Sequence, residues 1–404
     1  MEWKEVTLGD FMQCNPKRAI KKGQKARKIT MDLLIPHSKT IRNWNYEPYS
    51  GGAKFQNGDT IMARITPCLE NGKHAFVSIL DKGEIAYGST EYFVFCGKEE
   101  VSDNDFVYYL TKTPLFRDTA IKSMVGSSGR QRAQMDVLEN LKMLVPKDIS
   151  DQRRIASILS SLDRKIELNN KINADLEEMA QAIFKNWFVD FEPFKDGKFV
   201  DSELGMIPEG WRVGTIGDIV EFQNGFAFSS KDFSENGEYK IITIKSVQDG
   251  CLVTEGSSKV TEYPTKMPAY CKLQSGDILL SLTGNVGRCC LVTETNLLLN
   301  QRVAKIKAKE CYDNSFSYAL FRLKETKELL ISISRGTAQA NLSPVEASKL
   351  PMVIPSEDAR KKFSMISGSI MDKITSIHIE NRTLSTLRDT LLPRLMSGEI
   401  EVPE

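Results

Sequence analysis

The sequence predicts an α+β fold in which two similar mixed α/β domains are separated by two long antiparallel coiled-coil helices, as a dumbbell with approximate two-fold symmetry. The first observation behind this prediction is the length of 404 residues, which suits two or three domains. The second is an internal repeat that runs through the whole chain. The third is a change of period within each repeat, from short strand-like segments to apolar residues spaced seven apart.

The repeat consists of matching segments that stay about 208 to 218 residues apart, a constancy that chance matches would not show. The matched pairs are 2–10 with 211–218, 57–62 with 275–280, 72–73 with 287–288, 103–106 with 313–316, and 144–146 with 353–355. A repeat of this length is too long for a solenoid unit. We therefore interpret it as a duplicated domain together with its connector.

The first part of each repeat predicts a compact domain of strands and helices. Short stretches that are β-branched or alternating, and that are bounded by Gly and Asn, predict strands. They lie at 61–65, 92–95, 278–282 and 302–306. Helical segments follow in each copy, as at 106–111 and 317–330.

The second part of each repeat predicts one helix of about 38 residues, or roughly 57 Å. Two series of residues spaced seven apart form a seam along one side of each helix, as a coiled coil requires. The first helix carries Ile155, Leu162, Asn169, Leu176 and Ile183 with Leu159, Ile166, Asn173, Ala180 and Trp187; the second carries Phe363, Ile370, Ile377, Leu384 and Leu391 with Ser367, Ile374, Asn381, Arg388 and Leu395. Ser150 and Ser356 are the expected N-caps.

Three asparagines, Asn169, Asn173 and Asn381, fall in this seam, where polar residues lower stability but fix the register of the pair. The alternative is that they face water at a frayed section. The order of the elements predicts that the helices pair antiparallel, with one domain at each end. The expected division is 1–147 for the first domain, 148–190 for its helical spacer, 191–209 for a connector, 210–355 for the second domain and 356–404 for its helical spacer.

Several segments resemble type I restriction-modification specificity subunits, and the resemblance extends over the whole chain. The helical segments 151–163, 166–170 and 181–191, the segment 205–211, the C-terminal 391–400, and 63–73 in the first domain carry it. The resemblance implies two target-recognition domains, each of which reads one half of a bipartite double-stranded DNA target. It also implies helices that set the spacer and dock two methyltransferase subunits. The second helix departs from the family pattern, because Ser367 and Arg388 stand in its seam.

The chemistry of such a complex is implied to lie in the partner subunits. Methyltransferase subunits bind S-adenosylmethionine and methylate adenine, and restriction subunits use ATP and Mg to translocate and cut DNA. In agreement, this sequence has no Gly-x-x-x-x-Gly-Lys-Ser/Thr loop. The adenine methyltransferase motif is absent too, since Asn15-Pro16-Lys17-Arg18 breaks it at the third position. We expect a non-catalytic subunit with no cofactor and no metal of its own.

Possible catalytic residues are few and scattered. The three histidines, at 37, 74 and 378, are too far apart in sequence to suggest a metal cluster or a triad. Glu238-Tyr239-Lys240 faintly suggests the acid-x-lysine of a nuclease, but a surface hairpin edge explains it better. The eight cysteines form no Cys-x-x-Cys pair, and the N-terminus lacks a signal peptide's apolar core. We expect free thiols and a cytoplasmic protein.

The net charge of +1 means that any DNA-binding surface must be a local patch. Residues 17–42 contain nine Lys and Arg against one Asp, although a solvated loop is an equal alternative. Two glycine-containing loops, 126–132 and 335–341, favour close approach to a groove, with an ordinary turn as the alternative. The candidate DNA-binding residues are Lys17, Arg18, Lys73, Arg130, Gln131, Arg132, Arg288, Gln301, Arg302, Arg335 and Gln339.

Two other functions remain open at this point. One is a specificity module of a different class of restriction-modification system, although a solitary restriction enzyme would need catalytic motifs. The other is a coiled-coil scaffold that binds no DNA, which would leave the basic segment unexplained.

Overall fold

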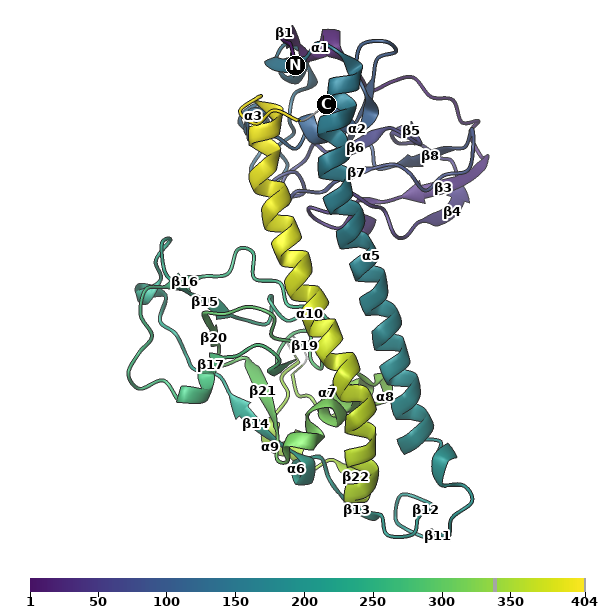
Figure 1. Ribbon diagram of the computed structural model, residues 1–404, viewed down its shortest axis with the longest axis vertical. Helices are drawn as coiled ribbons and strands as arrows, with labels where there is room; N and C mark the ends of the chain where they lie inside the picture. Colours follow the sequence, from purple (N-terminus) through teal and green to yellow (C-terminus); the bar gives the residue numbers. More distant parts are fainter. Residues whose placement is uncertain (337–339, 403–404) are drawn as a thin grey trace. The chain divides into compact units, whose positions relative to one another are not determined.

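The computed structural model describes residues 1–336 and 340–402, which divide into two compact units. Unit 1 comprises Met1–Leu168 and Arg382–Glu404, and unit 2 comprises Asn169–Asn381. Two helices of 40 residues each, α5 (Ile149–Phe188) and α10 (Glu357–Met396), are the longest in Figure 1. Both helices are shared between the units. Helix α5 contributes 149–168 to unit 1 and 169–188 to unit 2, and α10 contributes 357–381 to unit 2 and 382–396 to unit 1.

Unit 1 contains two four-stranded sheets, in the orders β2-β9-β6-β7 and β4-β3-β8-β5, and the pair β1-β10. Its strands are β1 (Trp3–Thr7), β2 (Met12–Cys14), β3 (Lys25–Ile29), β4 (Asn45–Pro48), β5 (Lys54–Gln56), β6 (Thr60–Ala63), β7 (His74–Phe76), β8 (Ile85–Gly88), β9 (Tyr92–Gly97) and β10 (Lys142–Pro146). Its short helices are α1 (Leu8–Phe11), α2 (Asn104–Leu110), α3 (Pro114–Lys122) and α4 (Met135–Glu139), with a 3-10 turn at Met31–Leu33.

Unit 2 repeats this topology strand for strand, with sheets β14-β21-β18-β19 and β16-β15-β20-β17 and the pair β13-β22. Its strands are β13 (Arg212–Thr215), β14 (Val220–Asn224), β15 (Tyr239–Ile242), β16 (Lys259–Val260), β17 (Lys272–Leu273), β18 (Ile278–Ser281), β19 (Cys289–Leu291), β20 (Leu297–Leu299), β21 (Val303–Ala308) and β22 (Pro351–Ile354). Its short helices are α6 (Ile216–Ile219), α7 (Asn314–Arg322), α8 (Lys324–Ser332) and α9 (Pro344–Ser348). A parallel pair of strands also recurs, as β3 with β8 and as β15 with β20. The predicted duplication of a mixed α/β domain is confirmed.

Two segments differ in detail from the prediction. The helical segment 317–330 is two helices, α7 and α8, because Leu323 is extended (φ −65°, ψ 134°) and ends the first of them. The connector contains a 3-10 turn (Glu192–Phe194) and the antiparallel pair of β11 (Phe199–Val200) with β12 (Ile207–Pro208). Further 3-10 turns lie at Ser230–Asp232, Ala269–Cys271 and Cys311–Asp313.

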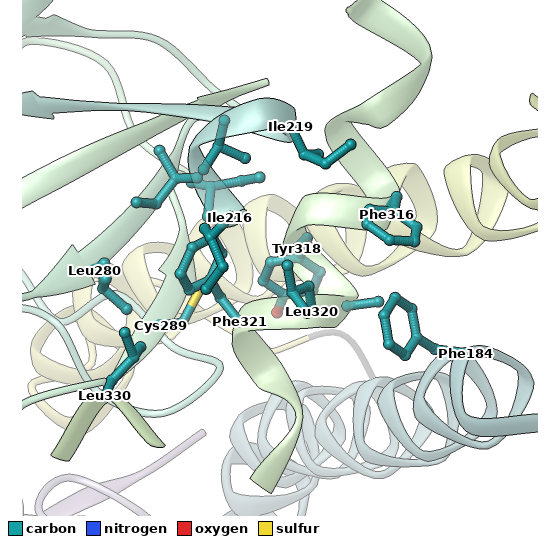
Figure 2. Close-up of a cluster of buried hydrophobic side chains, with 14 of the residues drawn as sticks. Phe184, Ile216, Ile219, Leu280, Cys289, Phe316, Tyr318, Leu320, Phe321 and Leu330 are labelled. Atoms are coloured by element: carbon teal, nitrogen blue, oxygen red, sulfur yellow. The ribbon is translucent and has the colours of Figure 1, made fainter. Parts of the chain in front are cut away.

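The core of unit 2 lies where its short helices pack against one sheet and the long helices. Figure 2 shows Phe316, Tyr318, Leu320 and Phe321 of α7 among side chains from α6, β18, β19 and α8, with Phe184 of α5 at one side. Unit 1 has the equivalent cluster, in which Phe106 to Leu110 of α2 meet Ile155 and Leu159 of α5 and Leu392 and Leu395 of α10. The apolar faces of the long helices are therefore buried mainly by their own unit's domain.

The two long helices also pair with each other, and within unit 2 they pair antiparallel. Asn169 Nδ2 donates to Asn381 Oδ1 at 2.9 Å, whereas Asn173, further along α5, donates to the carbonyl of Ile374 at 3.5 Å, further back along α10. Asn169, Asn173 and Asn381 are only 1%, 5% and 9% exposed. The predicted seam positions are confirmed, and the alternative that these asparagines face water is wrong.

The polar residues of the second helix's seam are also buried and paired. In unit 1, Arg388 forms an ion pair with Asp163 at 2.7 Å, with both side chains 7% exposed. In unit 2, Ser367 donates to Ser315 at 2.8 Å. These contacts let the second helix pack although its seam departs from an apolar pattern.

The helix starts confirm one predicted cap and correct the other. Ser356 is the N-cap of α10, since its Oγ accepts from the backbone N–H of Ala359 at 3.3 Å. Ser150 is not the N-cap of α5, because the helix already begins at Ile149 and the carbonyl of Asp148 accepts from the N–H groups of Asp151 and Gln152. Among the residues the structure describes, we find no helix that is long and apolar enough to cross a membrane.

Candidate nucleic-acid interface

A closed loop follows α3 in unit 1 and is fastened to the end of β6. Val125 and Arg132 exchange backbone hydrogen bonds of 3.0 and 2.9 Å, and Ala133 N–H donates to the carbonyl of Arg64 at 2.8 Å. We call residues 125–133 the first clasp. Its tip, with Gly126 and Gly129 at positive φ, is exposed, so Arg130 projects from a fixed base.

Unit 2 builds the same arrangement in its described residues. Arg335 and Asn341 exchange backbone hydrogen bonds of 2.9 and 2.8 Å, and Leu342 N–H donates to the carbonyl of Leu282 at 2.8 Å. We call Arg335, Asn341 and Leu342 the second clasp. Asn341 therefore occupies the position of Arg132, and Leu282 that of Arg64.

A carboxylate organises the side chains of the first clasp. Arg132 makes three hydrogen bonds to Glu91, at 2.7, 3.0 and 3.0 Å, and Arg64 donates to the same carboxylate at 3.2 Å. The Arg132 hydrogen bond is the main reason why the pKa of Glu91 lies below its ordinary value, with Arg64 adding to the effect against partial burial. Two arginines around one carboxylate leave a net positive cluster.

The second clasp presents different chemistry on the same backbone. Arg302 is at the position equivalent to Glu91 of unit 1. In unit 2 the Leu282 N–H donates to the Arg302 carbonyl at 3.1 Å, and in unit 1 the Arg64 N–H donates to the Glu91 carbonyl at 3.0 Å. Beside it lies an open depression of 660 Å³, whose lining includes Thr283, Gln301, Arg302 and Asn341. Thr283 donates to Asn341 Oδ1 at 2.9 Å and so orients the amide. Amides and guanidinium groups are the side chains that best read adenine and guanine edges.

The structure gathers some of the predicted residues and separates others. Arg130, Gln131 and Arg132 lie together on the first clasp, and Gln301, Arg302 and Arg335 lie at or beside the second. Arg335 also pairs with Glu346. Lys17 is exposed, and Gln339 lies outside the described residues.

Three predicted residues are held by local partners. Arg18 forms an ion pair with the buried Asp59 at 2.8 Å, Lys73 donates to the carbonyl of Met31, and Arg288 donates to the side chain of Gln248. Lys73 and Arg288 directly precede β7 and β19 and are therefore at equivalent positions in the two units. Their hydrogen bonds give them a role in holding loops.

The basic segment 17–42 is less positive than its composition indicates. Four of its nine cations form ion pairs with acids elsewhere in unit 1, namely Arg18 with Asp59, Arg27 with Asp81, Lys28 with Glu47 and Lys39 with Asp105. Lys17, Lys21, Lys22, Lys25 and Arg42 are exposed. A smaller exposed group of cations therefore remains available for phosphates.

The remaining features to place are the possible metal ligands and the acid-x-lysine segment. Within 1–336 and 340–402 there is no group of three or more His, Cys, Asp or Glu side chains placed to hold a metal ion. The acid-x-lysine segment is structural, since Lys240 bonds to Thr254 at 2.9 Å and Glu294 at 3.0 Å, and Glu238 accepts from Asn296.

The sequence analysis did not identify Arg64, Glu91 or Thr283 as candidates. It also did not show that Asn341 is at the position equivalent to Arg132. Each lies at a strand end or on a clasp, and aligning the two copies of the repeat would have placed Arg64 opposite Leu282 and Glu91 opposite Arg302. Differences at equivalent loop positions were the available signal.

Comparisons with known proteins agree on one family. A family model described as the type I restriction modification DNA specificity domain matches residues 1–178 and again 208–388. The type I restriction enzyme HindI specificity subunit of Haemophilus influenzae is 25% identical over 468 aligned positions, covering 99% of this chain and 100% of that protein. The MjaIX specificity subunit of Methanocaldococcus jannaschii is 28% identical over 307, covering 74% of this chain and 70% of that protein.

One solved structure shares the fold. The type I restriction-modification S subunit from M. genitalium aligns with a TM-score of 0.50 at 16% identity, covering 98% of this chain and 96% of that one.

Proposed function

This chain belongs to the type I restriction modification DNA specificity family, and from that premise we propose that it is the DNA-reading subunit of a restriction-modification complex. Each unit's domain reads one half of a bipartite double-stranded target. The chain supplies sequence specificity, and other subunits supply chemistry.

One observation carries this proposal: a single fold and a single clasp are built twice with different side chains at equivalent positions. Glu91, Arg132 and Arg64 in unit 1 correspond to Arg302, Asn341 and Leu282 in unit 2. A conserved backbone with exchanged polar groups is what two half-sites of different sequence require, because base edges are distinguished by their donor and acceptor patterns. A scaffold that binds no DNA would not need this variation.

The long helices are the proposed docking surface for two methyltransferase subunits. They expose large apolar side chains that their own unit leaves uncovered, among them Met179 of α5 at 53% exposure and Met365 of α10 at 78%. Methionine side chains are flexible and polarisable, which suits them to contact with a partner protein. Restriction subunits would join the same complex.

The chain is proposed to be non-catalytic and to bind no cofactor itself. S-adenosylmethionine would be bound by the methyltransferase subunits, and ATP and Mg by the restriction subunits. The absence of nucleotide-binding and methyltransferase motifs from the sequence supports this division of labour.

The test is to reconstitute the chain with its methyltransferase partner and to map methylated adenines in a random-sequence DNA library. We expect a bipartite motif with a fixed spacer. The variant Asn341→Ala should relax one half of the motif and leave the other half unchanged, and Gln131→Ala, which removes the amide of the first clasp, should do the reverse. The proposal fails if methylation does not require this chain, or if each variant alters both halves alike.

A further inference from the structure

Unit 1 contains a small pocket lined by cations that the clasp does not use. The pocket has a volume of 40 Å³, which is above the roughly 10–15 Å³ needed to hold one water molecule. It lies between α3, the start of β7 and the loop after β3. Its lining includes His37, Gly72, Lys73, Lys112 and Arg117.

Lys112 is the central group. Its Nζ is buried and has no hydrogen-bond partner among the described residues, lying 5.5 Å from the centroid of the Tyr108 ring. Burial is the main cause that lowers the pKa of Lys112 to about 8, and Arg388 adds to it. A buried ammonium without a partner is costly, so an anion beside it would be stabilising.

The charges that face the pocket do not supply that anion. Asp163 and Asp389 are the nearby carboxylates that favour the charged form of Lys112, but both are hydrogen-bonded to Arg388. Lys39, which also faces Lys112, is paired with Asp105. These acids therefore form their hydrogen bonds with Arg388 and Lys39, and none of them reaches the Lys112 Nζ atom.

The two histidines of the pocket, His37 and His74, do not offset the charge of Lys112 either. His74 Nε2 donates to Thr111 Oγ1 at 2.9 Å, because that hydroxyl uses its own proton on the carbonyl of Tyr108. Burial, with Lys112 and Arg117, holds the pKa of His74 well below its ordinary value, so the ring is neutral. Burial, then Arg117 and Lys112, also lower the pKa of His37.

Unit 2 shows how the same site looks when an anion is built in. Helices α3 and α8 have equal lengths and follow α2 and α7, so Lys112 and Arg117 correspond to Arg322 and Lys327. In unit 2 one carboxylate, Asp249 on the loop after β15, pairs with both cations, at 3.1 Å from Arg322 Nη1 and closely with Lys327 Nζ. Glu177 adds a second ion pair to Arg322, at 3.1 Å.

The loop after β3 brings a histidine, His37, to the cation pair where the loop after β15 brings Asp249. We propose that the pocket of unit 1 binds a small inorganic anion between Lys112, Arg117 and His37, in the place that the Asp249 carboxylate fills in unit 2. The ligand class is a halide or a small oxyanion such as phosphate. The small volume favours small ions over bulky organic anions.

The test compares the full-length chain in sodium chloride, sodium phosphate and sodium gluconate at one ionic strength, so that general screening is constant. Effects of a salt on folding that do not involve the pocket, such as the general stabilisation by phosphate, should appear equally in the variants described below and are subtracted. We expect Tm to be higher in chloride or phosphate than in gluconate, by about 3–5 °C at ten times the dissociation constant. The chain has three histidines, so the imidazole NMR signal of His37 can be followed. Its pKa should be higher with the bound anion by about one pH unit, because a negative charge favours the imidazolium. The salt that raises both Tm and the pKa of His37, chloride or phosphate, identifies the anion that the pocket binds.

Three variants sharpen the comparison. Lys112→Met removes the buried charge at similar length and should abolish the difference between the salts. Lys122→Met removes a positive charge outside the pocket, at the exposed end of α3, and should keep the difference in Tm between the salts. His37→Asp supplies the carboxylate internally and should raise Tm in gluconate while abolishing the response to small anions. If Lys112→Met does not fold, the His37→Asp comparison decides alone.

The proposal is overturned if Tm and the His37 pKa are the same in all three salts, or if Lys112→Met keeps the response. It is also overturned if a short DNA duplex shifts the His37 signal and the inorganic ions do not, since the pocket would then belong to the DNA interface.

Discussion

Arg130 and Arg132 of the first clasp are expected to have different roles in DNA binding. Arg130 is exposed at the tip, whereas Arg132 is 40% exposed and holds Glu91 through three hydrogen bonds. We predict that Arg130→Ala removes one phosphate contact. The salt slope of DNA binding should then fall by about 0.9, so that the loss of affinity from 50 to 200 mM salt becomes about 3.5-fold smaller.

Arg132→Ala should act differently, because it leaves Glu91 with Arg64 as its one arginine partner and turns a net positive cluster towards neutrality. An ion pair this exposed contributes only about 0.2–1 kcal/mol to folding, so the domain should stay folded. DNA affinity should nevertheless fall by about tenfold or more, since the carboxylate is no longer masked and repels phosphates. Glu91→Gln combined with Arg132→Ala should recover part of that loss.

The assay is a fluorescence anisotropy titration of a labelled target duplex at several salt concentrations, with the methyltransferase subunits present. Lys142→Ala, which removes an exposed cation of β10 paired with Glu5, serves as the control and should change neither affinity nor slope. Unchanged affinity and slope in both arginine variants would remove the first clasp from the interface. If the Glu91→Gln, Arg132→Ala double variant binds no better than Arg132→Ala, the masking argument is wrong.

Four further predictions concern the helices and the chemistry. Arg388→Met should destabilise unit 1 by about 3–5 kcal/mol, because Asp163 is left as a buried unpaired charge; a chemical denaturation midpoint equal to that of the wild type would contradict this. Replacing both Asn169 and Asn381 by Leu should raise the thermal midpoint but weaken register, visible as additional distances between spin labels on the two helices; a single unchanged distance would argue against a register role. The purified chain, incubated alone with labelled S-adenosylmethionine or with ATP and Mg, should neither methylate nor cut DNA, and any transfer of label above a heat-inactivated control would refute a purely recognising role. One heptad inserted near Asn173 and another near Asn381 lengthens each helix by roughly 10 Å, about three base pairs; we expect a longer preferred spacer, weaker binding and unchanged half-sites, and an unaltered spacer would exclude the helices as a ruler.

The sequence predicts the long helices well because their evidence is periodic and local. The seven-residue spacing predicts seam positions such as Asn169 and Arg388, and the presence of a second helix predicts that they are buried. Helix α5 starts two residues before its predicted start, because Ser150 offers a side-chain cap whereas the backbone carbonyl of Asp148 accepts the first hydrogen bonds.

The break between α7 and α8 illustrates a signal present in only one copy. In unit 1, Thr113-Pro114 marks the equivalent break, because the residue before a proline avoids the helical conformation. In unit 2, Leu323-Lys324 carries no such mark, and the break is visible only through the repeat.

The candidate interface was harder to predict because charge counting ignores long-range pairing. Arg18 is 41 residues from Asp59 in sequence, yet the two form an ion pair. Glu91 likewise reaches Arg132 over 41 residues. Composition identified the basic segment and the clasp loops, but only the fold shows which cations are already neutralised.

The division of the chain into units has a consequence for the order in which they are completed on the ribosome. Unit 2 is continuous, whereas unit 1 joins Met1–Leu168 to Arg382–Glu404. Until Leu392, Leu395 and Met396 have been synthesised, Ile155 and Leu159 lack part of the apolar cluster that buries them. The domain translated first is therefore the one that closes last, and its exposed helix face must be shielded from aggregation while the whole of unit 2 is made.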